Sequence, residues 1–185
     1  MNQFALDLQP QEPSYRLIPL TKGQFAKVDA ADYEWLMQWK WQAAWSRKTQ
    51  SYYAQRTIHI GGKSKTVIMT RVIMSAEGDI DIDHRNHDTL DNRRTNLRFS
   101  TAAQNACNRK RQANNTSGCK GVTWVPSHGK WRVRVRFKNI RTHIGYFNEF
   151  EEATLAYTEA ARRIQGEFMY DPNLPTVDNM GAPRM

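Results

Sequence analysis

Residues 80–105 read IDIDHRNHDTLDNRRTNLRFSTAAQN, and this stretch decides the predicted fold of the central part of the chain. Residues 80–84 alternate apolar and polar side chains, which predicts a strand, and residues 96–99 also have strand character. The residues between these two segments are polar and predict a loop. A capping-box pattern at Thr101 predicts a helix that continues to about Arg109. The expected order is strand, loop, strand and helix, which is a ββα unit.

The ββα unit is expected to bring a carboxylate, an imidazole and an amide oxygen together. Asp83 and His84 lie on the first strand, and Asn105 lies on the helix opposite them. A hard cation such as Mg²⁺, or Mn²⁺ in its place, accepts one or two protein oxygens, here from Asp83 and Asn105, while it keeps waters and substrate phosphate oxygens. An imidazole titrates near neutrality, so His84 can accept a proton from an attacking water. These residue types predict hydrolysis of a phosphodiester.

The spacing of Asp83-His84, Asn96 and Asn105 resembles the HNH endonuclease motif in its His-Asn-Asn variant, as it occurs in phage and homing-type enzymes. The resemblance implies a small ββα-metal (His-Me finger) module in which His84 is the general base. It also implies that Asp83 and Asn105 are the metal ligands and that Asn96, the middle member of the catalytic motif, braces the loop. The expected products carry a 5′-phosphate and a 3′-hydroxyl.

Three further positions differ from the metal-binding or auxiliary histidines of this family. His87 and His59 are interpreted as ordinary surface or core histidines rather than as metal ligands. Thr70 stands before Arg71 where these enzymes commonly carry a histidine, so no auxiliary role of that histidine is expected in this chain.

Residues 131–138, WRVRVRFK, alternate with a period of two, which predicts a strand with one apolar and one cationic face. Shorter strand patterns lie at residues 121–125 and 141–147, and residues 150–165 place small and apolar side chains at helical spacing. These patterns predict a three-stranded antiparallel sheet packed on one helix. The arginine row has no interleaved acids, which favours binding to a groove of duplex DNA over a merely solvated surface.

Residues 117–168 resemble the plant ethylene-response-factor type of DNA-binding domain, which also occurs fused to phage HNH nucleases. The resemblance rests on the Gly-Val, Gly-Lys-Trp and Ile-Gly-Tyr-Phe motifs and on the alanine-rich helix. It implies that the sheet enters the major groove. The expected DNA-binding residues are Lys120, Lys130, Arg132, Arg134, Arg136, Arg141 and His143. Thr123, Val125 and His128 replace residues usual in the plant proteins, so the resemblance does not supply the target sequence.

The composition agrees with a nucleic-acid partner. The chain has 185 residues with 27 Lys and Arg against 18 Asp and Glu, a net charge of +9 that favours a polyanion. Aromatic residues make up 11%, which is too many for a disordered polymer. No signal peptide or membrane span is visible, and Cys107 and Cys119 form no metal or disulfide pattern, so we expect free thiols and a cytoplasmic location, in the host cell if the protein is phage-encoded.

The predicted organisation has six segments. They are a flexible tail at 1–16, an α+β nuclease segment at 17–75, the HNH motif at 76–111, a linker at 112–118, the ethylene-response-factor-like domain at 119–169 and a flexible tail at 170–185. Within the second segment we expect a short helix capped at Asp29 and a hairpin around Gly61-Gly62. The tryptophans Trp35, Trp39, Trp41 and Trp45 are expected to build a small core, with a platform for stacked bases as the alternative.

The sequence thus predicts an α+β, site-specific DNA endonuclease that acts on double-stranded DNA as a monomer, in the manner of a homing-type nickase. No obligate protein partner and no membrane are expected. A DNA-binding regulator with an inactive nuclease centre is the main alternative, and the intact Asp83, His84, Asn96 and Asn105 argue against it. An RNA-binding protein would be expected to expose aromatic side chains on its sheet, where this sequence has arginines.

Overall fold

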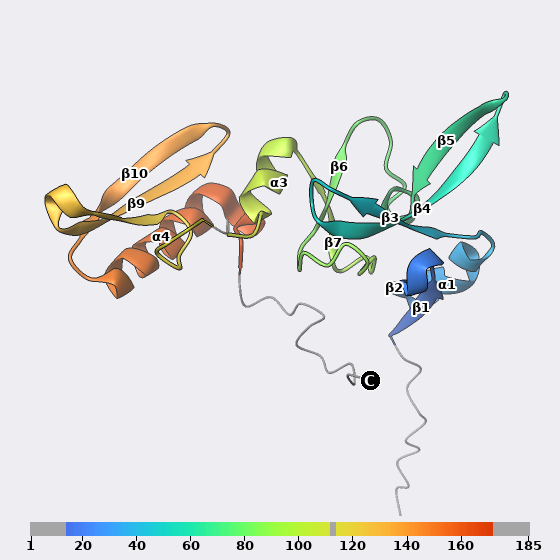
Figure 1. The fold of residues 1–185 in the computed structure, drawn as a ribbon, viewed down its shortest axis with the longest axis horizontal. Coiled ribbons are helices and arrows are strands. Elements are labelled where there is room, and N and C mark those ends of the chain that lie inside the picture. Colours follow the sequence, from blue (N-terminus) through green and yellow to red (C-terminus); the bar gives the residue numbers. More distant parts are fainter. Residues whose placement is uncertain (1–13, 112–113, 172–185) are drawn as a thin grey trace, which may run out of the picture. The chain divides into compact units, whose positions relative to one another are not determined.

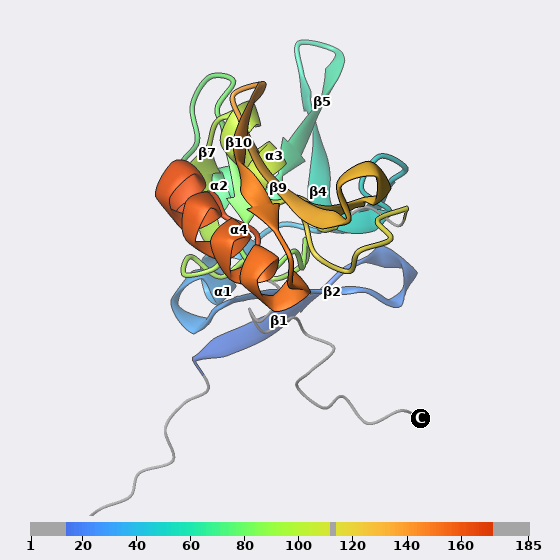
Figure 2. The same ribbon diagram turned by 90° about the vertical axis from the view of Figure 1, so that its left-hand side faces the viewer.

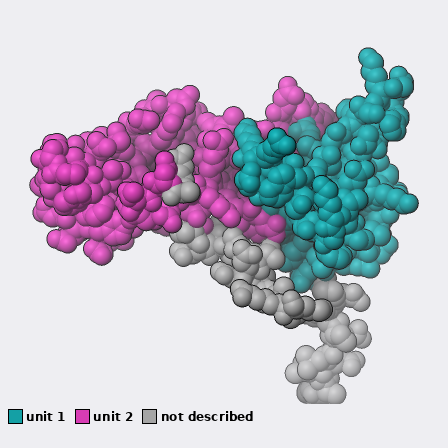
Figure 3. Space-filling view, in the orientation of Figure 1, with its two compact units in different colours: residues 1–75, 89–95 teal, residues 76–88, 96–185 magenta. Residues whose placement is uncertain are grey.

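The computed structural model describes residues 14–111 and 114–171, drawn as a coloured ribbon in Figure 1. The chain divides into two compact units, shown in Figure 3: unit 1 comprises residues 1–75 and 89–95, and unit 2 comprises residues 76–88 and 96–185. The predicted HNH motif at 76–111 therefore contributes to both units, because its loop packs with the N-terminal segment.

Unit 1 consists of a hairpin, a short helix and a small sheet followed by a second helix. The elements are β1 (Tyr15–Pro19), β2 (Phe25–Asp29), α1 (Ala30–Met37), β3 (Gln42–Ser46), β4 (Ser51–Ile60), β5 (Lys63–Ile68) and α2 (Met69–Ile73), with a 3-10 turn at Thr21–Gly23. Strands β3, β4 and β5 form an antiparallel sheet in that order, which confirms the hairpin predicted around the glycine pair. Its fully buried side chains include Ile18, Val28, Leu36, Met69 and Ile73.

The loop at 89–95 is joined to unit 1 by backbone and side-chain bonds. The Lys27 N–H donates to the Leu90 carbonyl at 2.8 Å, and the Asn92 N–H donates to the Lys27 carbonyl at 2.7 Å. The Arg94 guanidinium binds both carboxylate oxygens of Asp32, at 2.8 and 2.9 Å. Asp29 was predicted to cap α1, and this prediction is wrong for its side chain. The carboxylate accepts from the Arg94 N–H at 2.8 Å instead.

The tryptophan cluster is only partly a core. Trp41 is 4% exposed and donates its indole N–H to the Leu36 carbonyl at 2.8 Å, so the core prediction is right for this residue. Trp39 contacts Trp35 and Trp41 edge-on. Trp35 and Trp45 are 37% and 46% exposed, so the prediction is wrong for these two. Trp45 lies near the end of β3 and packs against Tyr52 of the neighbouring strand rather than into the interior.

The first part of unit 2 has the predicted ββα order. Strand β6 (Asp81–His84) pairs antiparallel with β7 (Leu97–Ser100), and α3 (Ala102–Asn108) follows directly. Thr101 forms the predicted capping box with Gln104, in which the Gln104 N–H donates to the Thr101 hydroxyl and the Thr101 N–H donates to the Gln104 side chain. The helix ends one residue before the predicted Arg109.

The second part of unit 2 is a sheet covered by a helix on one face. Strands β8 (Val122–Val125), β9 (Lys130–Phe137) and β10 (Ile140–Phe147) form an antiparallel sheet with β9 in the centre. Figure 1 and Figure 2 show α4 (Phe150–Gln165) running along this sheet, followed by a 3-10 turn at Gly166–Phe168. The core between them consists of Val122, Val133, Val135, Ala153, Tyr157, Ala160 and Ala161.

Gly121 shows how closely the sheet approaches its helix. The residue has a φ of +75°, and a Cβ at this position would lie 2.3 Å from the Tyr157 ring and 2.5 Å from the Arg134 carbonyl oxygen. Only glycine satisfies both the backbone conformation and the space. The Gly-Val motif of the sequence therefore corresponds to a packing requirement at the start of β8.

The predicted tails and linker fall partly outside the described residues. Residues 1–13, 112–113 and 172–185 are not described, but Tyr15 and Arg16 belong to β1 and so are not part of a tail. The described end of the linker is a bonded turn in which the Ser117 hydroxyl donates to the Val122 carbonyl at 2.7 Å. Both cysteines are free thiols, as predicted. None of the helices in the described ranges is long and apolar enough to cross a membrane.

Candidate active site

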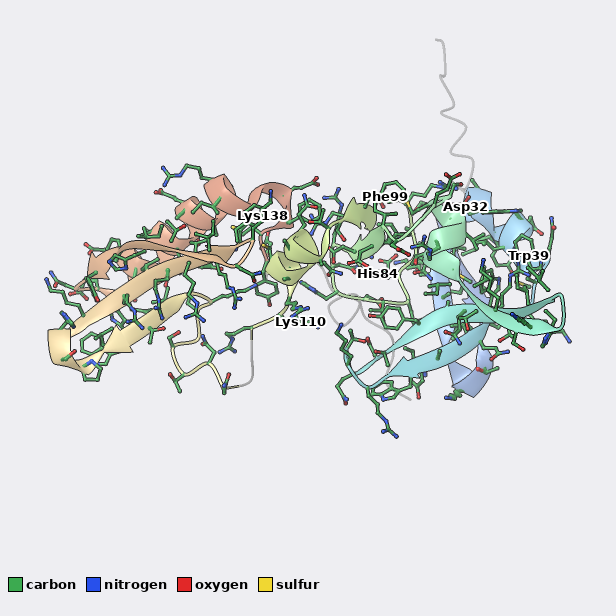
Figure 4. All side chains as sticks on the ribbon, turned by 90° about the horizontal axis from the view of Figure 1, so that it is seen from above. Asp32, Trp39, His84, Phe99, Lys110 and Lys138 are labelled. Atoms are coloured by element: carbon green, nitrogen blue, oxygen red, sulfur yellow. The ribbon has the colours of Figure 1, made fainter. Side chains whose placement is uncertain are left out.

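The antiparallel pairing of β6 and β7 places the candidate catalytic residues. Asp83 lies opposite Arg98 and His84 lies opposite Leu97 in the strand register. Asp83, His84 and Asn96 are all buried, with 6 to 7% of their surface exposed. Asn105 lies half-buried on α3. Figure 4 labels His84 in β6, and Lys110 just after α3.

The Asp83 carboxylate is held by two side chains that the sequence analysis did not select. The Arg98 Nε and Nη2 donate to Asp83 Oδ2 at 2.9 and 2.7 Å, and the Asn108 Nδ2 lies 3.1 and 2.9 Å from Oδ1 and Oδ2. Arg98 is itself only 7% exposed, so this is a buried ion pair. The orientation of the carboxylate is therefore fixed before any ligand binds.

Asn108 also connects α3 to His84. Its Nδ2 donates to the His84 main-chain carbonyl at 3.0 Å, and the His87 N–H approaches the same carbonyl at 3.2 Å. Asn108 follows Asn105 by three residues, and residues three apart on a helix lie on the same side. This spacing is the signal that would have identified it in the sequence.

Asn96 holds the beginning of the loop that follows β6. Its Oδ1 accepts from the Asn86 N–H at 3.0 Å, and its carbonyl accepts from the Arg85 N–H at 2.9 Å. The Asn86 Oδ1 in turn accepts from the Asp88 N–H at 2.9 Å. Asn96 thus positions the chain that directly follows His84.

His87 lies nearer to the site than its sequence interpretation indicated. Its backbone is left-handed with a φ of 64°, its ring contacts Tyr170 at 5.2 Å, and its Nε2 is buried without a hydrogen-bond partner among the described residues. Burial, with a further contribution from Lys110, lowers the pKa of His87 to about 4, although Asp83 opposes this shift. His59, by contrast, is exposed and pairs with Ser64 at 3.2 Å.

The donor set at Asp83 fits a hard divalent cation. No group of three His, Cys, Asp or Glu side chains that could hold a metal occurs in the described ranges. The Asp83 Oδ1 accepts one hydrogen bond there, and Asn108 Oδ1 is buried without a partner. Few protein oxygens, with waters and phosphate completing the shell, are typical of Mg²⁺ sites. The residues present therefore suit a Mg²⁺ or Mn²⁺ ion that binds together with the substrate.

The turn after α4 contacts the Arg98 side chain. The Arg98 Nη1 donates to the Glu167 carbonyl, and the Arg98 Cζ lies 4.0 Å from the centre of the Phe168 ring. The Glu167 carboxylate also pairs with Arg85 at 2.9 Å. Residues at the end of the predicted DNA-binding domain therefore contact the side chain that holds Asp83.

The cationic face of the sheet has the predicted arrangement of residues. In the pairing of β9 with β10, Arg136 lies opposite Arg141 and Arg134 lies opposite His143, so these four side chains share one face. Arg132 lies opposite Tyr146 on that face, and Lys130 is exposed at the start of β9. Val133 and Val135 point to the core on the other face.

Two features of this face differ from the sequence-based expectation. Lys120 directs its ammonium group to the carbonyls of Cys107 and Arg109, at 2.6 and 2.9 Å, and its burial lowers its pKa. The sheet also exposes an aromatic ring, since Tyr146 is 41% exposed and both His128 and His143 lie 5.0 Å from it. The sheet therefore exposes an aromatic ring as well as arginines, whereas the sequence predicted arginines in place of aromatic side chains.

The central segment is similar to a known family. Residues 71–107 match the family model described as HNH endonuclease. We call residues 71–107 the HNH segment. The HNH segment includes β6, β7, most of α3 and the end of α2.

A protein of Acanthamoeba polyphaga mimivirus described as an uncharacterized HNH endonuclease is 29% identical to the chain over 154 residues. The alignment covers 83% of this chain and 78% of the viral protein. The two comparisons confirm the predicted enzyme class, an HNH endonuclease. No solved structure matches the chain.

Proposed function

We propose that the protein is a metal-dependent, site-specific DNA endonuclease that nicks one strand of a duplex bound by the sheet β8–β10. The observation that carries the proposal is that unit 2 contains both the buried Asp83-His84 pair of the HNH segment and a cationic sheet face. The sequence has no Asp or Glu from Asn92 to Asn148, so no carboxylate from these strands opposes that face. The likeness of the sheet module to the ethylene-response-factor type of domain adds to this support.

The chemistry follows from the positions of the side chains in unit 2. His84 accepts a proton from the water that attacks the phosphorus, and Asn108 and Asn96 hold the chain on either side of it. Asp83 and Asn105 would hold the cation, with the Asn108 amide oxygen as a further donor beside them. When bound, a divalent cation stabilises the charge that develops on the phosphate and the leaving 3′ oxygen. The products are a 5′-phosphate and a 3′-hydroxyl.

The test is the substitution His84→Ala, with His59→Ala as the matched control in unit 1. The variant should lose cleavage of a supercoiled plasmid by roughly 10²- to 10⁴-fold, the usual contribution of a general base, while its affinity for DNA remains unchanged. The control should cleave like the wild type, because His59 is exposed and its ring pairs with the Ser64 hydroxyl on the neighbouring strand. Equal loss of binding and cleavage would mean that His84 has a structural role.

A DNA-binding regulator with an inactive nuclease centre is the second candidate, and the Arg98–Asp83 ion pair is the observation that favours it. The guanidinium binds Asp83 Oδ2 and competes with a cation for this oxygen. The two candidates differ in one measurement. A nuclease cleaves its source genome in Mg²⁺ or Mn²⁺ and only binds it in the presence of a chelator, whereas a regulator binds equally in both and never cleaves.

A further inference from the structure

A cavity of about 920 Å³ opens in unit 2 between the end of α3 and the edge of β9. Seven cationic side chains line it: Arg109, Lys110, Arg111, Lys120, Arg134, Arg136 and Lys138. No carboxylate is among the described residues of its wall, in agreement with the long acid-free stretch of the sequence. We call this cavity the cationic groove.

The groove exists because β8 is shorter than β9. Strand β8 pairs with β9 only as far as Val133, so the edge of β9 from Arg134 onward is not covered by that strand. The single bond from the Arg134 N–H to the Gly121 carbonyl, at 2.9 Å, continues the pairing. Lys120 holds the end of α3 here by its bonds to the Cys107 and Arg109 carbonyls. The fold thus directs two separate basic segments to one place.

The charge of the groove is not balanced within its wall. Like charges that share a small region repel one another, and this repulsion is relieved by solvent or by a bound anion. Gln165 adds a second observation: its Nε2 donates to the Arg136 carbonyl at 2.8 Å, while its Oε1 is buried without a partner and the residue is 7% exposed. The buried Gln165 Oε1 needs a hydrogen-bond donor, which a water molecule in the groove can supply, and protein–DNA interfaces are typically hydrated.

The groove adjoins the nuclease centre on one side and the sheet on the other. Ala106, Cys107 and Lys110 line the groove, and they lie on or directly after α3, the helix that also carries Asn105 and Asn108. Arg134 and Arg136 belong both to the groove and to the cationic face of β9. A DNA duplex with one phosphate at His84 and its bases at the sheet would therefore pass along the groove.

We propose that the cationic groove binds the phosphate backbone of the DNA duplex between the cleaved phosphate and the bases contacted by the sheet. This inference rests on the proposed nuclease function and adds Arg109, Lys110, Arg111 and Lys138 to the DNA-binding surface. Contacts to the backbone position a duplex and carry no sequence information. The groove therefore fixes the distance between the recognition site and the cut, and the sheet alone selects the sequence.

The experiment compares two double substitutions of equal charge in the full chain. Lys110→Gln/Arg111→Gln removes two cations of the groove, and Arg162→Gln/Arg163→Gln removes two exposed cations of α4 that do not line it. Duplex affinity is measured by fluorescence anisotropy over a range of KCl concentrations. Each lost phosphate contact lowers the slope of log Kd against log [KCl] by about 0.9, so the groove variant should lose about 1.8. The control should keep the wild-type slope.

The outcomes separate the groove from the nuclease proposal. The groove variant should lose affinity equally for target and random duplex. If the slope of this variant is unchanged while the wild type binds and cleaves, the groove proposal is overturned and the nuclease proposal stands. A wild type that neither binds nor cleaves any duplex would overturn both. Inorganic phosphate is the second probe: saturable binding that Lys110→Gln abolishes would assign the groove to a free anion instead of DNA.

Discussion

Arg98 is the residue on which the candidate centre depends most. Its guanidinium reaches the Asp83 carboxylate, the Glu167 carbonyl and the Phe168 ring, so one side chain connects the HNH segment with the turn after α4. The pair is buried, and removal of one partner leaves an uncompensated charge in the interior. Sequence reasoning treated Arg98 as one residue of a strand, because nothing in its own neighbourhood indicates its partner.

We expect Arg98→Met to lower the free energy of unfolding by about 3–5 kcal/mol, the usual cost of breaking a buried ion pair from one side. The double variant Arg98→Met/Asp83→Leu should recover part of this loss, since it removes both charges. Urea unfolding followed by circular dichroism measures the two single variants and the double variant as a cycle. Additive losses would mean that the two side chains do not interact in solution.

Strand β9 is the element in which the pattern of the sequence and the structure agree best. Alternation with a period of two directs Val133 and Val135 into the core against α4 and leaves Arg132, Arg134 and Arg136 on the opposite face. The strand register then places Arg141 and His143 beside these arginines. A continuous cationic surface results from two strands, neither of which carries an acidic residue.

Arg134→Ala and Arg136→Ala should each weaken binding to the target duplex by about 1–3 kcal/mol if they contact bases. Binding to random duplex should change much less, because base contacts and not phosphate contacts carry the preference. Anisotropy at one salt concentration measures the affinity for each duplex, and the ratio of the two affinities gives the preference for the target. Thr142→Ala, on the same strand pair, is the control. No change for either arginine variant would exclude this face as the reading surface.

The sequence contains one set of the candidate catalytic residues, Asp83, His84, Asn96 and Asn105, and in the described residues they belong to one ββα unit. A single centre cuts one strand at a time, and cleavage of both strands needs either a dimer on a two-fold site or a second binding event. A single copy of the protein that binds a duplex through its sheet can gain affinity on an asymmetric site. These considerations favour a monomer that nicks.

A supercoiled plasmid that carries the target should therefore become open circles before any linear form appears. The time course is followed on an agarose gel at limiting protein concentration, with His84→Ala as the blank. Linear DNA that forms directly, with no open-circle intermediate, would contradict the monomeric nickase and indicate that two copies act together.

The sequence by itself determined the features that depend on local backbone geometry. Strand alternation, the capping box at Thr101 and the spacing of Asp83, His84, Asn96 and Asn105 are read within a few residues of one another, and they predicted the ββα order and the sheet with its helix. These patterns are reliable because a helix or strand fixes which neighbours share a face. They also fixed the enzyme class, which rests on motif spacing.

Only the tertiary structure decided which distant residues meet. The pairing of β6 with β7 sets Arg98 on Asp83, the loop at 89–95 joins unit 1 through Asp32, and the short β8 leaves an edge where residues 109–111 meet Arg134 and Arg136. Each of these contacts joins two segments that are distant in the sequence, and the local pattern of neither segment predicts the other as its partner. Which segments meet depends on how the whole chain packs its core. The periodicity of a local sequence pattern contains no information about that packing.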